Sequence, residues 1–89
     1  MDQWLTIAFD STQQAIYTEM LLEYAEVEID TYPTPKEITA GCALSIQFPE
    51  QFLEKVKYVI ITEKVEIRGI FRKEGSQYIE IDVGEENEE

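Results

Sequence analysis

The fold is decided by the stretch at residues 5–17, which reads LTIAFDSTQQAIY. The large apolar side chains Leu5, Ile7 and Phe9 occupy every second position, and this period of two is typical of a half-buried β-strand. Ser11 then provides a helix N-cap, and Gln14 stands three residues later, as in a capping box. The stretch therefore predicts a short strand that leads directly into a helix ending near residue 25.

The predicted helix carries apolar side chains at the spacing of one buried face. Four of them define the expected stripe, namely Tyr17, Met20, Leu21 and Tyr24, and three others broaden it, namely Ala15, Ile16 and Leu22. Three carboxylates, Glu19, Glu23 and Glu26, are expected on the solvent side, because charged side chains are rarely buried.

Four more strands and one more helix complete the pattern. Alternation predicts strands over residues 27–32, 43–48, 65–73 and 77–83. Pro49 suits the first position of the second helix, whose buried residues would be Phe52, Val56, Val59 and Ile60, out to about Lys64. The order is that of an α+β, ferredoxin-like βαββαβ domain with an extra C-terminal hairpin strand and two helices on one face of an antiparallel sheet.

The other face of the predicted sheet is expected to be mostly polar and to face water. It would carry Thr6, Ala8, Glu28, Asp30, Ser45 and Gln47. A second copy of the chain could pair with this face near Tyr32 and Ile70, although nothing in the sequence specifically indicates a homodimer.

The chain has 89 residues, enough for one domain, predicted over residues 1–83, with an acidic, disordered tail over residues 84–89. The net charge of −12 is concentrated at the two ends. Residues 1–35 contain seven acidic and no basic side chains, and residues 80–89 contain six acidic and no basic ones. Nucleic acids and anionic membranes are recognised by clustered Lys and Arg, so neither is an expected partner.

Cysteine use and hydropathy favour a cytoplasmic location. The chain has a single cysteine, which cannot form an internal disulfide. No apolar run approaches the ~20 residues that cross a bilayer, and the N-terminal residues lack the basic and apolar segments of a signal peptide.

Histidine is absent from the sequence, which excludes the commonest general base and every Ser–His or Cys–His pair. The four glycines are scattered, so no phosphate-binding loop is predicted. With one cysteine and no histidine, neither a metal site nor a bound cofactor is expected. Cys42 is the one remaining side chain suited to covalent chemistry.

Cys42 follows a long connection between two predicted strands, and such connections are often functional. Backbone N–H groups at Gly41, Cys42 and Ala43 could converge on its thiolate. Three nearby side chains, Lys36, Thr34 and Thr39, could add a positive charge and two hydroxyl donors, and two prolines, Pro33 and Pro35, would hold the loop open.

A structural role for Cys42 is the competing interpretation. Free cysteines are among the most buried residue types and usually pack as small hydrophobic side chains. Cys42 also shares strand parity with Leu44, Ile46 and Phe48, which would point its thiol into the core.

Two stretches of the sequence resemble a known family. They read TIAFDST at residues 6–12, followed by Ala15, and PTPKEITAGCAL at residues 33–44. Together they are similar to the selenium/sulfur carrier protein-like domains, small bacterial domains found alone or beside a sulfurtransferase-type domain, and the similarity spans about residues 5–73. The sequence departs from the family at Ala43, where members often have glycine. The resemblance implies that Cys42 carries sulfur or selenium as a persulfide or a selenide-type adduct.

The resulting hypothesis is a carrier in which the Cys42 thiol accepts sulfur or selenium from a donor protein, such as a cysteine desulfurase or a sulfurtransferase-like domain, and passes it to an acceptor protein. Such a carrier needs an exposed thiolate but no general base. The alternative is a non-catalytic ferredoxin-like interaction or regulatory module in which Cys42 is structural. A stand-alone enzyme is less favoured than either, because no acid–base group accompanies the thiol.

Overall fold

The computed structural model describes residues 3–81 and 83, and its elements follow the predicted order. They are β1 (Trp4–Ala8), α1 (Thr12–Tyr24), β2 (Asp30–Pro33), β3 (Leu44–Pro49), the short 3₁₀ helix η1 (Glu50–Phe52), α2 (Leu53–Thr62), β4 (Gly69–Glu74) and β5 (Gln77–Ile81). Two parts of the prediction, the acidic tail over 84–89 and the last strand beyond Ile81 at Asp82, lie outside the described residues.

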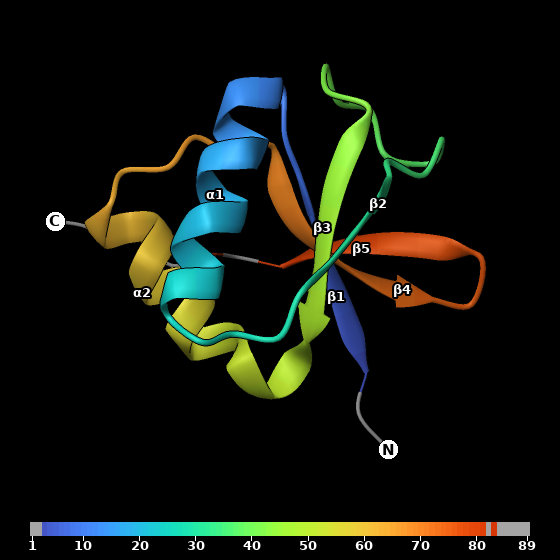
Figure 1. Cartoon of the computed structure of the whole chain (residues 1–89). Helices are drawn as coiled ribbons and strands as arrows, with labels where there is room; N and C mark the ends of the chain where they lie inside the picture. The colour runs from blue at the N-terminus through green and yellow to red at the C-terminus, as the bar shows by residue number, and fades with distance from the viewer. Residues whose placement is uncertain (1–2, 82, 84–89) are drawn as a thin grey trace, which may run out of the picture.

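The five strands form one antiparallel sheet in the order β2-β3-β1-β4-β5. Both helices lie on the same side of this sheet (Figure 1). The first four strands have the ferredoxin-like arrangement, and β5 extends the sheet beyond β4, so the predicted α+β fold with an extra hairpin strand is confirmed. Among the described residues, no helix has the length and apolar character to cross a membrane.

The core lies between the helices and the sheet, and the side chains of the central strand β1 lie at its centre. Leu5 pairs with Phe48 of β3, and Ile7 pairs with Ile46 of β3 on one side and Ile70 of β4 on the other. All five side chains are fully buried. Because successive strand residues point to opposite faces, this register sends the largest apolar side chains of three strands toward the helices.

Only half of the predicted capping box forms at the start of α1. The Ser11 hydroxyl accepts a hydrogen bond from the Gln14 backbone N–H at 3.4 Å, as an N-cap should. The Gln14 side chain does not turn back to Ser11, because its Oε1 accepts a hydrogen bond from the Glu66 N–H at 3.0 Å. The glutamine therefore connects α1 to the loop before β4.

The two helices end in the same way, and this shortens the strands that follow them. Glu26 and Lys64 adopt positive φ angles of 64° and 56°, and the next residues, Val27 and Val65, donate hydrogen bonds to carbonyls five residues earlier. These are Schellman-type endings, in which the valine packs back onto the helix. Both valines are buried. Since the chain must leave each ending before it can pair, β2 and β4 begin later than alternation predicts.

The predicted buried face of α1 is partly wrong: Ala15 and Leu22 are buried and Leu21 packs against the core as expected, but the other four predicted residues are exposed. The buried residues are Ala15, Thr18 and Leu22, whereas the exposed ones are Ile16, Tyr17, Met20 and Tyr24. Thr18 is accommodated because its hydroxyl donates to the Gln14 carbonyl at 2.8 Å. Apolar side chains occur on every side of this helix, so spacing alone did not identify its inner face.

The expectation of a polar, wet second sheet face is also partly wrong. Thr6, Ala8 and Ser45 are buried, although Glu28 and Asp30 are exposed and Gln47 is half-buried. The connection from β2 to β3 reaches this face, where the Thr34 and Ser45 hydroxyls lie 2.7 Å apart. Ile70 is buried on the helix side, so it is not available for pairing with a second copy, whereas Tyr32 is exposed.

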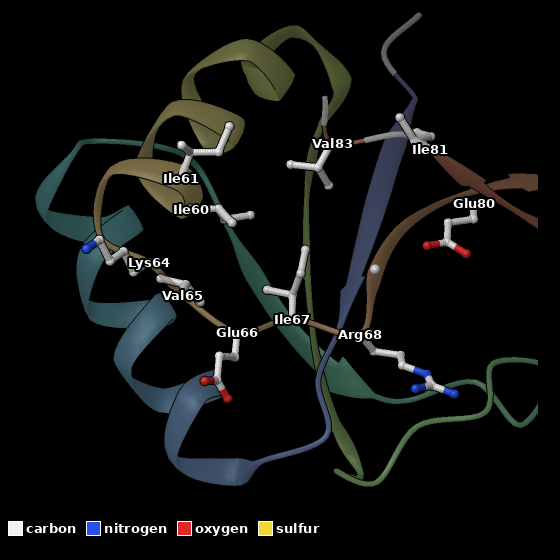
Figure 2. Close-up of a pocket in the computed structure, with 11 residues that line it drawn as sticks. Ile60, Ile61, Lys64, Val65, Glu66, Ile67, Arg68, Glu80, Ile81 and Val83 are labelled. Carbon is white, nitrogen blue, oxygen red and sulfur yellow. The ribbon is translucent and has the colours of Figure 1, made fainter. Parts of the chain in front are cut away.

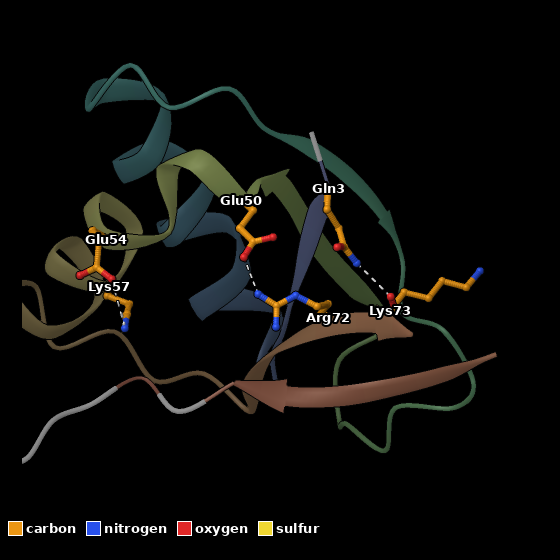
Figure 3. A network of polar contacts seen from close by, with 6 residues as sticks. All are labelled: Gln3, Glu50, Glu54, Lys57, Arg72 and Lys73. Carbon is orange, nitrogen blue, oxygen red and sulfur yellow. Dashed lines mark hydrogen bonds and ion pairs between the residues drawn. The ribbon is translucent and has the colours of Figure 1, made fainter. Parts of the chain in front are cut away.

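Polar contacts join η1 and the N-terminal segment to β4, and Figure 3 shows them. Arg72 forms an ion pair with Glu50, and the Gln3 side chain donates to the Lys73 carbonyl at 2.9 Å. Pro49 ends β3 and caps η1, so it does not occupy the first position of α2 as predicted. Proline lacks an N–H and therefore suits the place where strand pairing stops.

Candidate functional site

The connection between β2 and β3 spans residues 34–43 and is held at both ends by hydrogen bonds. At its base, the Thr34 N–H donates to the Ala43 carbonyl at 2.8 Å. A turn follows, in which the Ile38 N–H donates to the Pro35 carbonyl at 3.0 Å. The Ile38 side chain is buried and anchors the turn. The segment is therefore an ordered loop packed on the sheet, and we call it the cysteine loop.

A second set of contacts ties the far part of the cysteine loop to the end of β1. One carboxylate oxygen of Asp10 accepts a hydrogen bond from the Gly41 N–H at 2.8 Å, and the other lies 3.6 Å from Arg68 Nη1. Arg68 Nε also donates to the Thr39 carbonyl at 3.1 Å. We call these four residues the Asp10–Arg68 clasp. Both charged side chains are about half exposed, so water can compete for the ion pair.

Gly41 is required by close packing within the clasp. A Cβ atom at this position would lie 2.8 Å from the Asp10 carbonyl oxygen, which belongs to the backbone. A methyl group would therefore push the loop away from the end of β1.

Cys42 lies where the cysteine loop returns to the helix side of the sheet. Its N–H donates to the Phe9 carbonyl at 3.0 Å, and its side chain is only 3% exposed. The sulfur lies 3.3 Å from the Thr12 hydroxyl and accepts a hydrogen bond from the Leu44 N–H at 3.3 Å. Because Thr12 is the first residue of α1, the sulfur sits at the positive end of that helix, where a negative charge is favoured.

A surface cavity of about 370 Å³ adjoins the sulfur. Its lining consists of Cys42 and six neighbours, Thr12, Thr31, Tyr32, Pro33, Ala43 and Leu44. The walls therefore come from the start of α1, the edge strand β2 and the end of the cysteine loop. A small group attached to the sulfur would have space in this direction.

The residues predicted around Cys42 are divided among different roles. Thr34 donates to the Cys42 carbonyl oxygen at 3.0 Å rather than to the sulfur, and Thr39 contributes its carbonyl to the clasp. Pro33 lines the cavity, and Pro35 accepts the hydrogen bond of the turn. Lys36 is exposed and makes no hydrogen bond or ion pair with the residues described.

The predicted convergence of backbone N–H groups on the thiolate is wrong for Gly41 and Cys42. The Gly41 N–H is used by Asp10, and the Cys42 N–H is used by Phe9. The sulfur instead receives the N–H of Leu44, two residues later, and meets Thr12 from a distant part of the sequence. Alternation and local spacing gave no signal for these partners, because they depend on where α1 begins relative to β3.

A larger cavity of about 580 Å³ lies between the end of α2 and β5, and Figure 2 shows its walls. Apolar side chains such as Ile60, Val65 and Ile67 form much of it, with Lys64, Glu66, Arg68 and Glu80 at the margin. Its lining contains no cysteine thiol, because Cys42 is not part of it. The smaller cavity is therefore the candidate site.

The fold and the site together define a ferredoxin-like domain with one cysteine held between a helix N-terminus and a structured loop. A family model described as "Putative Se/S carrier protein-like" matches residues 5–72, and the chain belongs to this family. The match begins in β1, extends into β4 and includes Cys42 with its entire loop. Searches of curated proteins and of solved structures find no match to the chain.

Proposed function

We propose that this protein carries sulfur or selenium on Cys42 and transfers it between partner proteins in the cytoplasm. Family membership supports this proposal, and the observation that carries it is the position of the sulfur. It lies within hydrogen-bonding distance of Thr12 and Leu44 and borders a cavity that opens to the surface. A cysteine that served only to fill the core would need neither polar partners nor adjoining space.

The chemistry is an exchange between thiols and persulfides. The Cys42 thiolate attacks the outer sulfur of a donor persulfide, the sulfur–sulfur bond of the donor breaks, and the donor cysteine leaves as a thiolate. Cys42 then carries one additional sulfur. An acceptor thiolate attacks that outer sulfur in the same way and regenerates Cys42. Electrons balance in both steps, so no external oxidant or reductant is required, and no histidine is needed as a base.

Transfer requires the cysteine loop to open, because Cys42 is only 3% exposed and a protein partner cannot reach its sulfur. The clasp is the natural point of release, since its ion pair is half exposed and is worth little in water. The base of the loop is held more firmly by the Thr34 hydrogen bonds. Opening would therefore expose the sulfur from the side of Gly41 while β2 and β3 remain paired.

The same burial supports a second candidate function. Cys42 belongs to the main apolar core, together with Ile46 and Phe48, as expected for a structural cysteine. In that case the protein is a non-catalytic interaction or regulatory module. Replacement of Cys42 would then reduce stability and leave partner binding unchanged.

Sulfur loading distinguishes the two functions. The folded protein is incubated with sodium polysulfide, desalted and analysed by intact mass, and the Cys42→Ala variant serves as the control. The carrier proposal predicts that the wild type gains the mass of one sulfur atom, that dithiothreitol removes it, and that Cys42→Ala gains none. A folded wild type that gains no sulfur would contradict the carrier function and favour the structural role.

A further inference from the structure

The outward face of α1 is apolar. Ile16, Met20 and Tyr24 are 52%, 60% and 91% exposed, and they follow one another at intervals of four residues. This spacing places them in a single row along the helix, which we call the α1 stripe. Helices normally turn such a row toward the core, but here Ala15, Thr18 and Leu22 occupy the inner face. Among the described residues, the α1 stripe has no covering element.

The α1 stripe leads directly to the candidate site. One further step of four residues toward the N-terminus reaches Thr12, which contacts the Cys42 sulfur and lines the adjoining cavity. A protein that packs along the stripe would therefore have part of its surface at the mouth of that cavity. The same helix, α1, therefore carries both the stripe and Thr12, the residue that contacts the sulfur.

The charges around the α1 stripe indicate which partner fits. A carboxylate lies on each side of the stripe. On one side Glu23 is exposed, and on the other side Glu63, at the end of α2, accepts a hydrogen bond from the Tyr17 hydroxyl at 3.5 Å. No Lys or Arg occurs in the first 35 residues, so α1 itself contains no basic side chain to offset these carboxylates. Packing a second copy symmetrically on the stripe would bring like charges together, which is unfavourable. A partner with an apolar patch edged by Lys or Arg is complementary.

We propose that the α1 stripe is the docking surface for the protein that exchanges sulfur with Cys42, and that this partner presents an apolar patch bordered by basic side chains. The inference rests on the proposed carrier function. The composition of the stripe is consistent with it, because methionine adapts to different surfaces and tyrosine contributes a large contact area. The acidic border would increase the rate of encounter and make it sensitive to salt.

The test compares a small donor with a protein donor. Sodium polysulfide does not need a docking surface, whereas a cysteine desulfurase supplied with L-cysteine must bring its own persulfide to Cys42. The test variant is Met20→Glu, and the matched control is Tyr58→Glu, which changes a 68% exposed side chain on α2. Circular dichroism and thermal unfolding establish that both variants are folded.

We expect polysulfide to load the wild type and both variants at the same rate. Desulfurase loading should fall at least about tenfold in Met20→Glu and remain unchanged in Tyr58→Glu, since a charge placed within an apolar contact costs more than one outside it. Loading of the wild type by the desulfurase should also decrease as salt increases, while loading by polysulfide should not.

The outcomes separate the docking surface from the proposed function. Equal desulfurase loading of Met20→Glu and wild type would overturn the docking surface and leave the carrier function intact. A wild type loaded by polysulfide but not by the desulfurase would also overturn it. If neither donor loads the wild type, the carrier function itself fails. If the wild type is a dimer and Met20→Glu is a monomer, the stripe pairs two copies of the chain, which likewise contradicts a basic partner.

Discussion

Two pairs of neighbouring antiparallel strands are joined in different ways in this molecule. β4 and β5 are connected by only two residues, Gly75 and Ser76, and the positive φ of Gly75 is what such a tight turn requires. β2 and β3 are paired in the same manner but are connected by residues 34–43. Two residues suffice to connect adjacent antiparallel strands, so strand pairing does not explain why the connection between β2 and β3 is so much longer.

The difference lies in what each connection holds. The hairpin turn at Gly75 has open space around it, and a methyl group added to this glycine would meet no atom within 4 Å. The cysteine loop contains buried Ile38 and buried Cys42 and is fastened through Asp10, Thr34 and Arg68. The loop thus encloses a thiol, and these contacts are distinct from the strand pairing of β2 with β3. Four substitutions test this contrast.

Ile38→Ala should have the largest effect. Removal of this buried anchor is expected to cost about 2–3 kcal/mol of loop or global stability, because buried Ile→Ala substitutions leave a cavity. The native-state rate of Cys42 alkylation by iodoacetamide should rise strongly, as measured by intact mass. If stability falls in urea unfolding but the labelling rate does not change, Ile38 does not hold the loop over the sulfur.

Gly41→Ala should have the next largest effect. The added methyl group meets the Asp10 backbone and must displace the loop, at a cost of about 1–3 kcal/mol typical of overpacking. The displacement weakens the Gly41–Asp10 hydrogen bond, so Cys42 labelling should accelerate. Labelling as slow as in the wild type would show that the clasp is not what limits access to the sulfur.

Gly75→Ala is the matched glycine substitution in the short connection. An alanine at a φ of 62° is destabilised by about 1 kcal/mol relative to glycine, and no steric contact adds to this cost. Chemical unfolding should therefore detect a modest loss of stability, while the rate of Cys42 labelling in the folded state stays at the wild-type value. Accelerated labelling would mean that the two connections do not open independently.

Arg68→Gln should have the smallest effect on stability, below about 1 kcal/mol, because its ion pair with Asp10 is exposed. It should nevertheless increase Cys42 labelling several-fold, because the clasp loses its links to both Asp10 and Thr39. Arg72→Gln is the control, since it removes another ion pair from the β4 region without touching the loop. Equal labelling of the two variants would contradict a specific role for the clasp.

Sequence patterns predicted the order of elements and the fold, because the alternating strands and the Ser11 N-cap are local features. They predicted burial of Ala15 and Leu22 on α1 but also of Met20, which is exposed, because apolar residues occur all round the helix and only tertiary packing selects Leu22 over Met20. They also placed two strand starts too early, because Glu26 and Lys64 extend the helix endings in a conformation more typical of glycine.

Of the candidate site, the sequence identified the cysteine, Cys42, but not the residues that contact its sulfur. Cys42 stood out by elimination, but its partners Thr12 and Leu44 could not be identified without knowing how α1 meets β3. The clasp depends on Asp10 and Arg68, which are far apart in the sequence and are brought together by the pairing of β1 with β4. Long-range contacts of this kind are fixed by topology rather than by local propensity.

The most direct test is the urea dependence of Cys42 alkylation below the unfolding transition. The labelling rate, relative to that of an unstructured cysteine peptide, yields the free energy of the opening that exposes the sulfur. A carrier thiol requires opening with a free energy well below that of global unfolding and nearly independent of urea, because only the loop moves. If the opening free energy and its urea dependence both equal those of global unfolding, Cys42 is reached only in the unfolded protein, and the cysteine loop is not a releasable cover over a working thiol.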